Sequence, residues 1–67
     1  SMTKLDLKED DIVVIRAFED EWPEHVFRVT DVWEDCVGGV SLDGPLKDEY
    51  GEPDYDLILR VHSRAKG

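Results

Sequence analysis

Residues 26–33 read VFRVTDVW, and this stretch decides what the rest of the chain can form. Phe27 and Val29 are two positions apart, so they share one face of an extended strand. Val32 falls out of this alternation, because it stands three positions after Val29. One extra residue near Thr30-Asp31 would return Val32 to the face of Phe27, and such a β-bulge also bends the strand. The stretch therefore predicts a long, sharply bent β-strand.

Three further apolar runs lie on either side of this stretch, at residues 12–15, 37–42 and 55–61. Each has the length of a β-strand, is rich in β-branched residues and is bounded by acids, Gly or Pro. No long segment keeps the i, i+3, i+4, i+7 apolar stripe of an amphipathic helix. The sequence therefore predicts an all-β fold, with at most a short helical turn between Thr3 and Asp10.

Alternation within these runs predicts the core. In the last run it places Leu59 inward and Ile58 outward, and in the first run it leaves Ile12 and Val14 partly covered on the outer side. The predicted core is Val13, Ile15, Phe27, Val29, Val40, Leu42, Leu57, Leu59 and Val61. Outward apolar residues often mark a contact surface, so Ile12, Val14 and Ile58 predict a homo-oligomer.

The connections between the runs differ in length. Glu34-Asp35 predicts a tight turn, and Gly38-Gly39 predicts a bend or a close backbone approach. Residues 43–54, DGPLKDEYGEPD, form a much longer connection that contains Tyr50. Long loops in small domains often carry function. The tail from Ser63 onward is expected to fray.

Acids dominate the composition. Seventeen Asp and Glu stand against eight Lys and Arg, which gives a formal charge of −9. Such a surface repels the phosphates of nucleic acids and of anionic lipids, and it attracts cationic partners. We therefore expect a basic protein or peptide as partner, with no direct binding to nucleic acid or membrane. The basic residues Arg60, Arg64 and Lys66 near the C-terminus are expected to act as internal counter-charge.

Length and cysteine content bound the architecture further. The 67 residues predict a single small domain over residues 2–67, with Ser1 interpreted as the remnant of a removed tag. Cys36 is the single cysteine, so no intrachain disulfide can form. No apolar stretch is long enough to span a bilayer and there is no signal-type segment, so we expect a cytoplasmic protein.

Residues 8–15, KEDDIVVI, resemble the entry strand of SH3-like, KOW-like and Tudor-like small barrels. Those strands often begin with a Gly-Asp-x-Val pattern, and here Asp10 stands in place of the Gly. Trp22, in the loop before the long bent strand, adds to the likeness, which covers residues 8–61. The resemblance implies a small SH3-like barrel of about five strongly bent antiparallel strands. True SH3 domains carry an Ala-Leu-Tyr-Asp-Tyr segment and a Trp-Trp pair that this chain lacks, so proline-peptide binding is not implied.

Few residues suit catalysis or metal binding. A Cys–His nucleophile pair needs hydrogen-bond reach, and nothing in the sequence places His25 or His62 beside Cys36. Asp43-Gly44 and Asp48-Glu49 supply oxygen ligands for hard cations, but their spacing does not match a calcium-binding loop. We therefore expect no catalytic residues, no metal and no cofactor.

Aromatic residues set among carboxylates are the clearest functional signal. An aromatic ring backed by acids suits a cationic side chain, and Tudor-like modules, which the chain resembles, use such cages for methylated Lys or Arg. The alternative to a binding role is that Trp33 and Tyr55 cap the barrel core. Trp22 stands beside a Pro in an acidic loop, so we expect it to be exposed or at an interface. The predicted ligand-binding residues are Trp22, Trp33, Tyr50, Tyr55, Glu21, Glu24, Asp48 and Glu49.

Three functions are open from the sequence. The first is a non-enzymatic interaction module that binds a basic peptide or protein through the aromatic–acidic surface. The second is an acidic decoy that imitates nucleic acid and blocks a DNA- or RNA-binding protein, in which case the aromatics would be buried and the carboxylates spread over one broad face. The third is a small enzyme whose site, holding His25 or His62, forms where subunits meet. The chain also resembles small orphan proteins carried on bacterial mobile elements, a likeness that rests on no particular residue.

Overall fold

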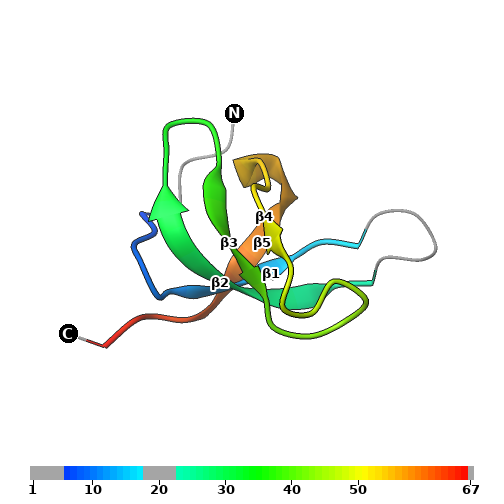
Figure 1. Cartoon of the computed structure of the whole chain (residues 1–67). Coiled ribbons are helices and arrows are strands. Elements are labelled where there is room, and N and C mark those ends of the chain that lie inside the picture. Colours follow the sequence, from blue (N-terminus) through cyan, green and yellow to red (C-terminus); the bar gives the residue numbers. More distant parts are fainter. Residues whose placement is uncertain (1–5, 18–22, 67) are drawn as a thin grey trace.

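The computed structural model of the chain describes residues 6–17 and 23–66. These residues form one antiparallel sheet with strands β1 (Ile12–Ile15), β2 (His25–Val32), β3 (Val37–Ser41), β4 (Tyr50–Gly51) and β5 (Ile58–Ser63). A short 3₁₀ turn, η1 (Tyr55–Leu57), leads directly into β5. The strand order is β4-β3-β2-β1-β5 (Figure 1). The predicted all-β fold of about five antiparallel strands is confirmed.

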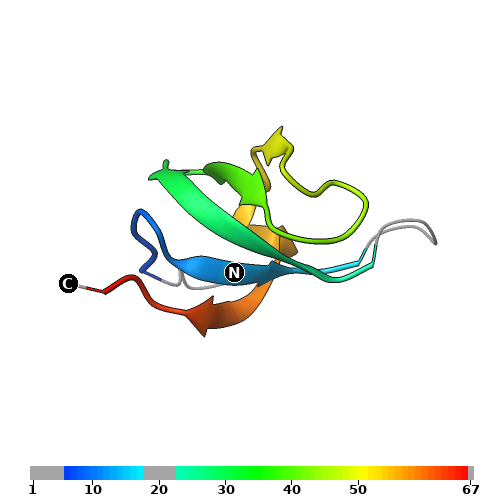
Figure 2. The ribbon, with the colours of Figure 1, turned by 60° about the horizontal axis from the view of Figure 1, so that its bottom comes forward.

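Strand β2 bends the sheet. It pairs with β1 through residues 25–28 and with β3 through residues 27–32. Val29 pairs with Gly39 and Asp31 pairs with Gly38, so Thr30 is the extra residue of a bulge at the predicted place. Figure 2 shows the outcome, in which β3 and β4 fold over β1 and β5. The buried core residues come from β1, β2, β3 and β5, together with Leu7.

The bulge also returns Val32 to the inner face, since it pairs with the buried Val37. Val32 nevertheless lies at the end of the sheet and stays 42% exposed. The turn that follows is the tight one predicted at Glu34-Asp35, closed by a hydrogen bond from the Trp33 backbone N–H to the Cys36 carbonyl (2.9 Å).

The chain enters β1 through a tight turn at residues 8–11. Asp10 adopts a φ of 75°, the left-handed conformation that Gly takes most readily and that Asp tolerates better than most residues. Its backbone N–H donates to the Val29 carbonyl (2.7 Å), which fixes the turn against β2. The described part of the segment from Thr3 to Asp10, residues 6–10, contains no helix; the 3₁₀ turn of the described chain lies at η1 instead.

Asp11 ties the two ends of the described chain together. Its fully buried carboxylate accepts hydrogen bonds from the backbone N–H groups of Lys8 (3.0 Å) and Ala65 (2.7 Å) and from Arg64 Nη1 (3.1 Å). Burial acts to raise the pKa of Asp11, but these hydrogen bonds outweigh it and hold the pKa below its usual value. The prediction of a fraying tail from Ser63 is therefore wrong as far as Ala65. Arg64 acts as counter-charge here, as expected, and Arg60 does so beside Glu24 (3.4 Å).

The core differs from the predicted one at several positions, and on β5 the difference has a clear cause. Its buried members are Leu7, Val13, Ile15, Phe27, Val29, Val37 and Ile58. The predicted residues Val40, Leu42, Leu57 and Val61 are only partly buried. Ile58 is 3% exposed and Leu59 is 44% exposed, the reverse of the prediction. The reason is a register shift: Val14 pairs with Arg60 but Ile15 pairs with Ile58, so Leu59 is an extra residue in β5 and the alternation changes parity there.

The observed burial also removes the reasoning behind the predicted oligomer. Val14 and Ile58, two of its three supposedly outward residues, are buried within the subunit. Oligomerisation itself stays a prediction, now without that support.

Candidate functional site

Strands β2, β3 and β4 present one outer face, turned away from the core. Asp31 pairs with Gly38, and Val40 pairs with Tyr50, so these four residues lie on that side. The neighbouring Gly39 points inward, because a Cβ placed on it would meet the ring of the core residue Phe27. The Gly38-Gly39 pair, predicted to allow a close approach, does so on both faces of β3.

Trp33 and Tyr50 meet over Gly38. A Cβ at Gly38 would lie 2.8 Å from Trp33 Cζ3 and in collision with the Tyr50 hydroxyl, so both rings cross a position that has no side chain. Trp33 is still 45% exposed and Tyr50 55% exposed. The two aromatic side chains therefore form a pair that rests on the sheet and faces solvent.

Carboxylates surround this pair. The Tyr50 hydroxyl donates a hydrogen bond to Glu52 Oε2 (3.0 Å). Partial burial, that hydrogen bond and the negative charges of Glu52 and Asp31 raise the pKa of Tyr50 above its ordinary value. Asp31 is in turn oriented by Thr30 Oγ1 (3.0 Å). We call Asp31, Trp33, Gly38, Tyr50 and Glu52 the aromatic face.

Tyr55 serves the core more than the aromatic face. It is half-buried, packs against the core cluster and donates its hydroxyl to the Trp33 carbonyl (2.6 Å). It thus fixes the backbone that carries Trp33. The core-capping interpretation therefore describes Tyr55, while Trp33 is exposed.

The other predicted site residues lie elsewhere. Glu24 pairs with Arg60 of β5, on the opposite edge of the sheet from β4. Asp48, at a φ of 70°, belongs to the turn before β4, and Glu49 lies beside the inner pocket described below. Trp22 and Glu21 fall outside the described residues. Of the eight predicted residues, Trp33 and Tyr50 are the ones that the structure brings together over Gly38.

The sequence analysis missed Asp31, Gly38 and Glu52 as members of the site. The spacing of Tyr50 and Glu52, two positions apart, could have indicated a shared face, but β4 lies in what reads as a loop. Asp31 becomes part of the site through the bulge at Thr30, because the bulge sets which residues face outward beyond it.

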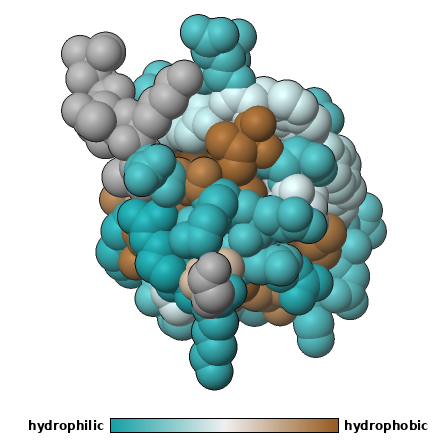
Figure 3. Space-filling model, turned by 90° about the vertical axis from the view of Figure 1, so that its left-hand side faces the viewer, coloured by the Kyte–Doolittle hydropathy of each residue, from teal (hydrophilic) through white to brown (hydrophobic). Residues whose placement is uncertain are grey.

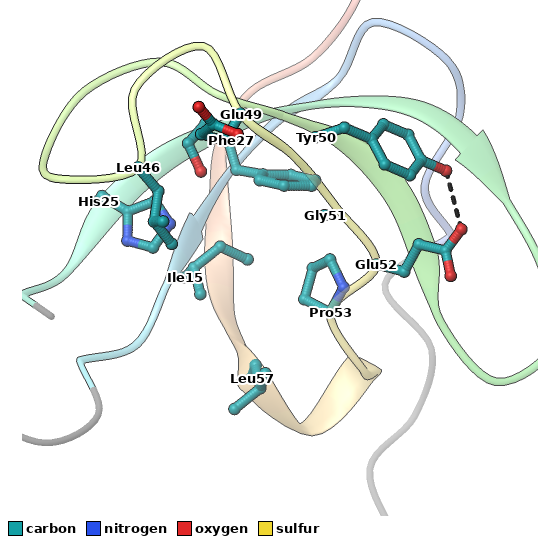
Figure 4. A pocket seen from close by; sticks show the side chains of 11 residues that line it. Ile15, His25, Phe27, Leu46, Glu49, Tyr50, Gly51, Glu52, Pro53 and Leu57 are labelled. Carbon is teal, nitrogen blue, oxygen red and sulfur yellow. Dashed lines mark hydrogen bonds between the residues drawn. The ribbon is translucent and has the colours of Figure 1, made fainter.

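An inner pocket of about 250 Å³ lies on the other side of β4 (Figure 4). Its walls are mostly apolar and include Ile15, Phe27, Leu46, Pro53 and Leu57. The same lining holds the polar residues His25, Ser41, Glu49 and Glu52 and the backbone of β4. In Figure 4 the Tyr50 ring and Glu52 point away from the pocket centre, so β4 separates the inner pocket from the aromatic face.

A second, more polar hollow of about 350 Å³ adjoins Trp33, lined by Leu7, Val32 and Tyr55 with Asp6 and Glu34. Figure 3, seen from the left-hand side of Figure 1, shows that apolar surface on that side of the molecule is interrupted by hydrophilic residues. The second hollow adjoins the aromatic face through Trp33. Its polar residues, Asp6 and Glu34, are again acidic, so it offers a ligand the same kinds of contact as the aromatic face.

Three described residues, Cys36, His25 and His62, are candidates for nucleophilic or acid–base chemistry. Cys36 is partly buried, and burial together with Glu52, Asp54 and Asp35 raises the pKa of its thiol, so it stays protonated and weakly nucleophilic. His25 is buried with Nδ1 3.1 Å from the Pro23 carbonyl, while His62 is exposed on β5. Within the described ranges, no three His, Cys, Asp or Glu residues gather closely enough to hold a metal ion.

Comparison with known proteins gives no further lead: no family model, no curated protein and no solved structure matches the chain. The described part of the chain also contains no helix that is long and apolar enough to cross a membrane.

Proposed function

We propose that the protein is a non-enzymatic interaction module that binds a basic peptide or protein at the aromatic face. The observation that carries this proposal is the Trp33–Tyr50 pair, which lies over Gly38 with about half of each side chain exposed. A Lys or Arg side chain laid across these rings would have Asp31 and Glu52 at its charged end. The proposal includes the predicted cytoplasmic location and the SH3-like architecture.

The energies of such contacts set the expected affinity. A cation–π contact at an exposed site contributes about 0.5–1 kcal/mol, and an exposed ion pair contributes about as much. One basic side chain therefore gives weak binding, and useful affinity needs several basic residues on one partner. The charge of −9 favours encounter with such a chain over a neutral or acidic one.

The decoy hypothesis is the alternative, and the aromatic face argues against it. A decoy that presents phosphate-like charge is expected to have its aromatic side chains buried, whereas Trp33 and Tyr50 are exposed. Arg28, exposed on β2 and in line with Val40 and Tyr50, also interrupts the acidic surface on this side. The exposed aromatic pair favours the interaction module, whereas Arg28 opposes a basic partner as much as it opposes a decoy.

A peptide titration tests the proposal. The probes are the pentapeptide acetyl-KKAKK-amide and its acidic counterpart acetyl-EEAEE-amide, followed by heteronuclear NMR. We expect the basic peptide alone to shift the Trp33 indole and Tyr50 ring signals, and Trp33→Ala to weaken its binding several-fold. Leu59→Ala is the matched control, because it truncates an equally exposed apolar residue on the far edge of the sheet. Equal loss in both variants, or equal binding of both peptides, would contradict the proposal.

A further inference from the structure

The inner pocket is an apolar feature of the described chain that the aromatic face does not use. It lies between the sheet, the 43–49 loop and η1, and its floor is the ring of Phe27, which is itself almost fully buried. Leu46, Leu57 and Pro53 are all only partly buried and stand around this floor (Figure 4). The pocket is thus an apolar hollow that remains open at the surface of the folded chain.

Its size selects the kind of group that fits. An apolar cavity of about 150 Å³ holds one benzene molecule, and pockets for whole small-molecule ligands usually begin near about 300 Å³. At about 250 Å³ the inner pocket matches a single bulky side chain, such as Phe or Leu, rather than a larger cofactor or metabolite.

The charge at the rim of the pocket indicates whether the partner that supplies this side chain is basic or acidic. Glu49 is exposed beside the pocket, and within the described residues the lining contains no Lys or Arg, while the neighbouring Lys47 and Asp48 are both exposed and offset each other's charge. An acidic peptide would meet repulsion at this rim, whereas a basic one would be attracted. Glu52 also borders the pocket, but its side chain points away from the pocket centre and accepts a hydrogen bond from the Tyr50 hydroxyl on the outer side of β4, within the aromatic face.

We propose that the inner pocket receives one bulky apolar side chain, Phe or Leu, of the same basic partner whose Lys or Arg side chains lie on the aromatic face. The partner thus crosses the two-residue strand β4, with its apolar anchor on one side and its basic residues on the other. This inference rests on the proposed function and adds a sequence requirement to it: an apolar anchor flanked by basic residues.

Peptides that differ at one position test the anchor. The probes are acetyl-KKFKK-amide, acetyl-KKAKK-amide and acetyl-EEFEE-amide, observed through the methyl groups of Ile15, Leu46 and Leu57 and through the Trp33 indole. We expect the Phe peptide to bind about tenfold tighter than the Ala peptide and to shift the pocket methyls, because burying a Phe side chain is worth at least that factor. The acidic Phe peptide should shift neither set.

Gly51→Leu blocks the pocket selectively. A Cβ at Gly51 points toward Phe27 from 4.0 Å, an ordinary contact distance, so a side chain can start there and extend on the pocket side of β4. In this variant the tenfold preference for the Phe peptide should fall to about one, while the Ala peptide still shifts Trp33. Should Gly51→Leu fail to fold, Leu46→Gln at a half-buried loop position provides the same comparison.

The outcomes separate this inference from the proposed function. If both basic peptides shift Trp33 with equal affinity and the pocket methyls do not move, the anchor is wrong and the interaction module stands. If the methyls respond to the Phe peptide while Trp33 does not, the aromatic face is wrong. If the methyls shift on dilution without any peptide, a second copy of the chain occupies the pocket, and that result would overturn the proposed occupant.

Discussion

At the scale of single residues, two positions control this molecule, and the first is Asp11. Its carboxylate satisfies two backbone N–H groups and the Arg64 guanidinium in a fully buried place. Removing it takes away the acceptor of the Lys8 and Ala65 backbone N–H groups, while Arg64 keeps its hydrogen bond to the Asp6 carbonyl (3.0 Å), and each buried group left unsatisfied costs about 1–3 kcal/mol. We expect Asp11→Ala to lower the free energy of unfolding by about 3 kcal/mol or more, measured by urea denaturation.

The pH dependence of Asp11 follows from its lowered pKa. The folded state favours the ionised carboxylate relative to the unfolded state, so this contribution is complete above the unfolded pKa of about 3.8 and is lost as the pH falls toward the lower folded pKa. Between about pH 5 and pH 3, the free energy of unfolding should therefore fall less for Asp11→Asn than for the wild type. Parallel urea midpoints for the two proteins across that range would show that Asp11 is not the group responsible.

The second position is Gly38. Gly38→Ala places a methyl group where the Tyr50 hydroxyl and the Trp33 ring lie, so the rings must move apart while both aromatic residues are retained. We expect this variant to bind acetyl-KKAKK-amide several-fold more weakly than the wild type. Its circular dichroism spectrum should remain that of a β-sheet protein. The readout is Trp33 fluorescence in a Trp22→Phe background. Unchanged affinity would mean that the placement of the two side chains over Gly38 plays no part in binding.

At the scale of elements, the bulges decide which residues face the core. The bulge in β2 could be predicted because the apolar residue Val32 stands three positions after Val29, which breaks the two-residue alternation of a strand. The bulge in β5 could not, because Leu57, Ile58 and Leu59 are all apolar and either parity looks acceptable. The same limit applies to the site: Trp33 and Tyr50 were predicted as ligand-binding residues, but their meeting over Gly38 depends on pairing between β3 and β4, two elements joined by a long loop.

Paired truncations in β5 test this register. Ile58→Ala removes a core side chain and should cost about 2–5 kcal/mol, whereas Leu59→Ala removes an exposed one and should change stability by about 0.5 kcal/mol or less. Chemical denaturation of both variants provides the comparison. A larger loss for Leu59→Ala would restore the simple alternation and contradict the register of β1 with β5.

At the scale of the whole molecule, charge sets both stability and partner choice. With seventeen acids and eight Lys and Arg, nine acids must remain without a basic partner of their own even if every Lys and Arg pairs once (17 − 8 = 9). Self-repulsion then opposes the compact state, and screening relieves it. We expect the melting temperature to rise between low salt and about 0.15 M salt, measured by calorimetry. A constant or falling melting temperature would mean that the acids are compensated within the fold.

The central claim is that a basic side chain lies on the Trp33–Tyr50 pair. The most direct measurement is the set of intermolecular nuclear Overhauser contacts between acetyl-KKAKK-amide and the protein. The account predicts contacts from the lysine methylene groups to the Trp33 and Tyr50 rings, with signals on β5 unaffected. Lysine contacts spread evenly over the acidic surface, with none to these two rings, would contradict the account and favour the acidic decoy.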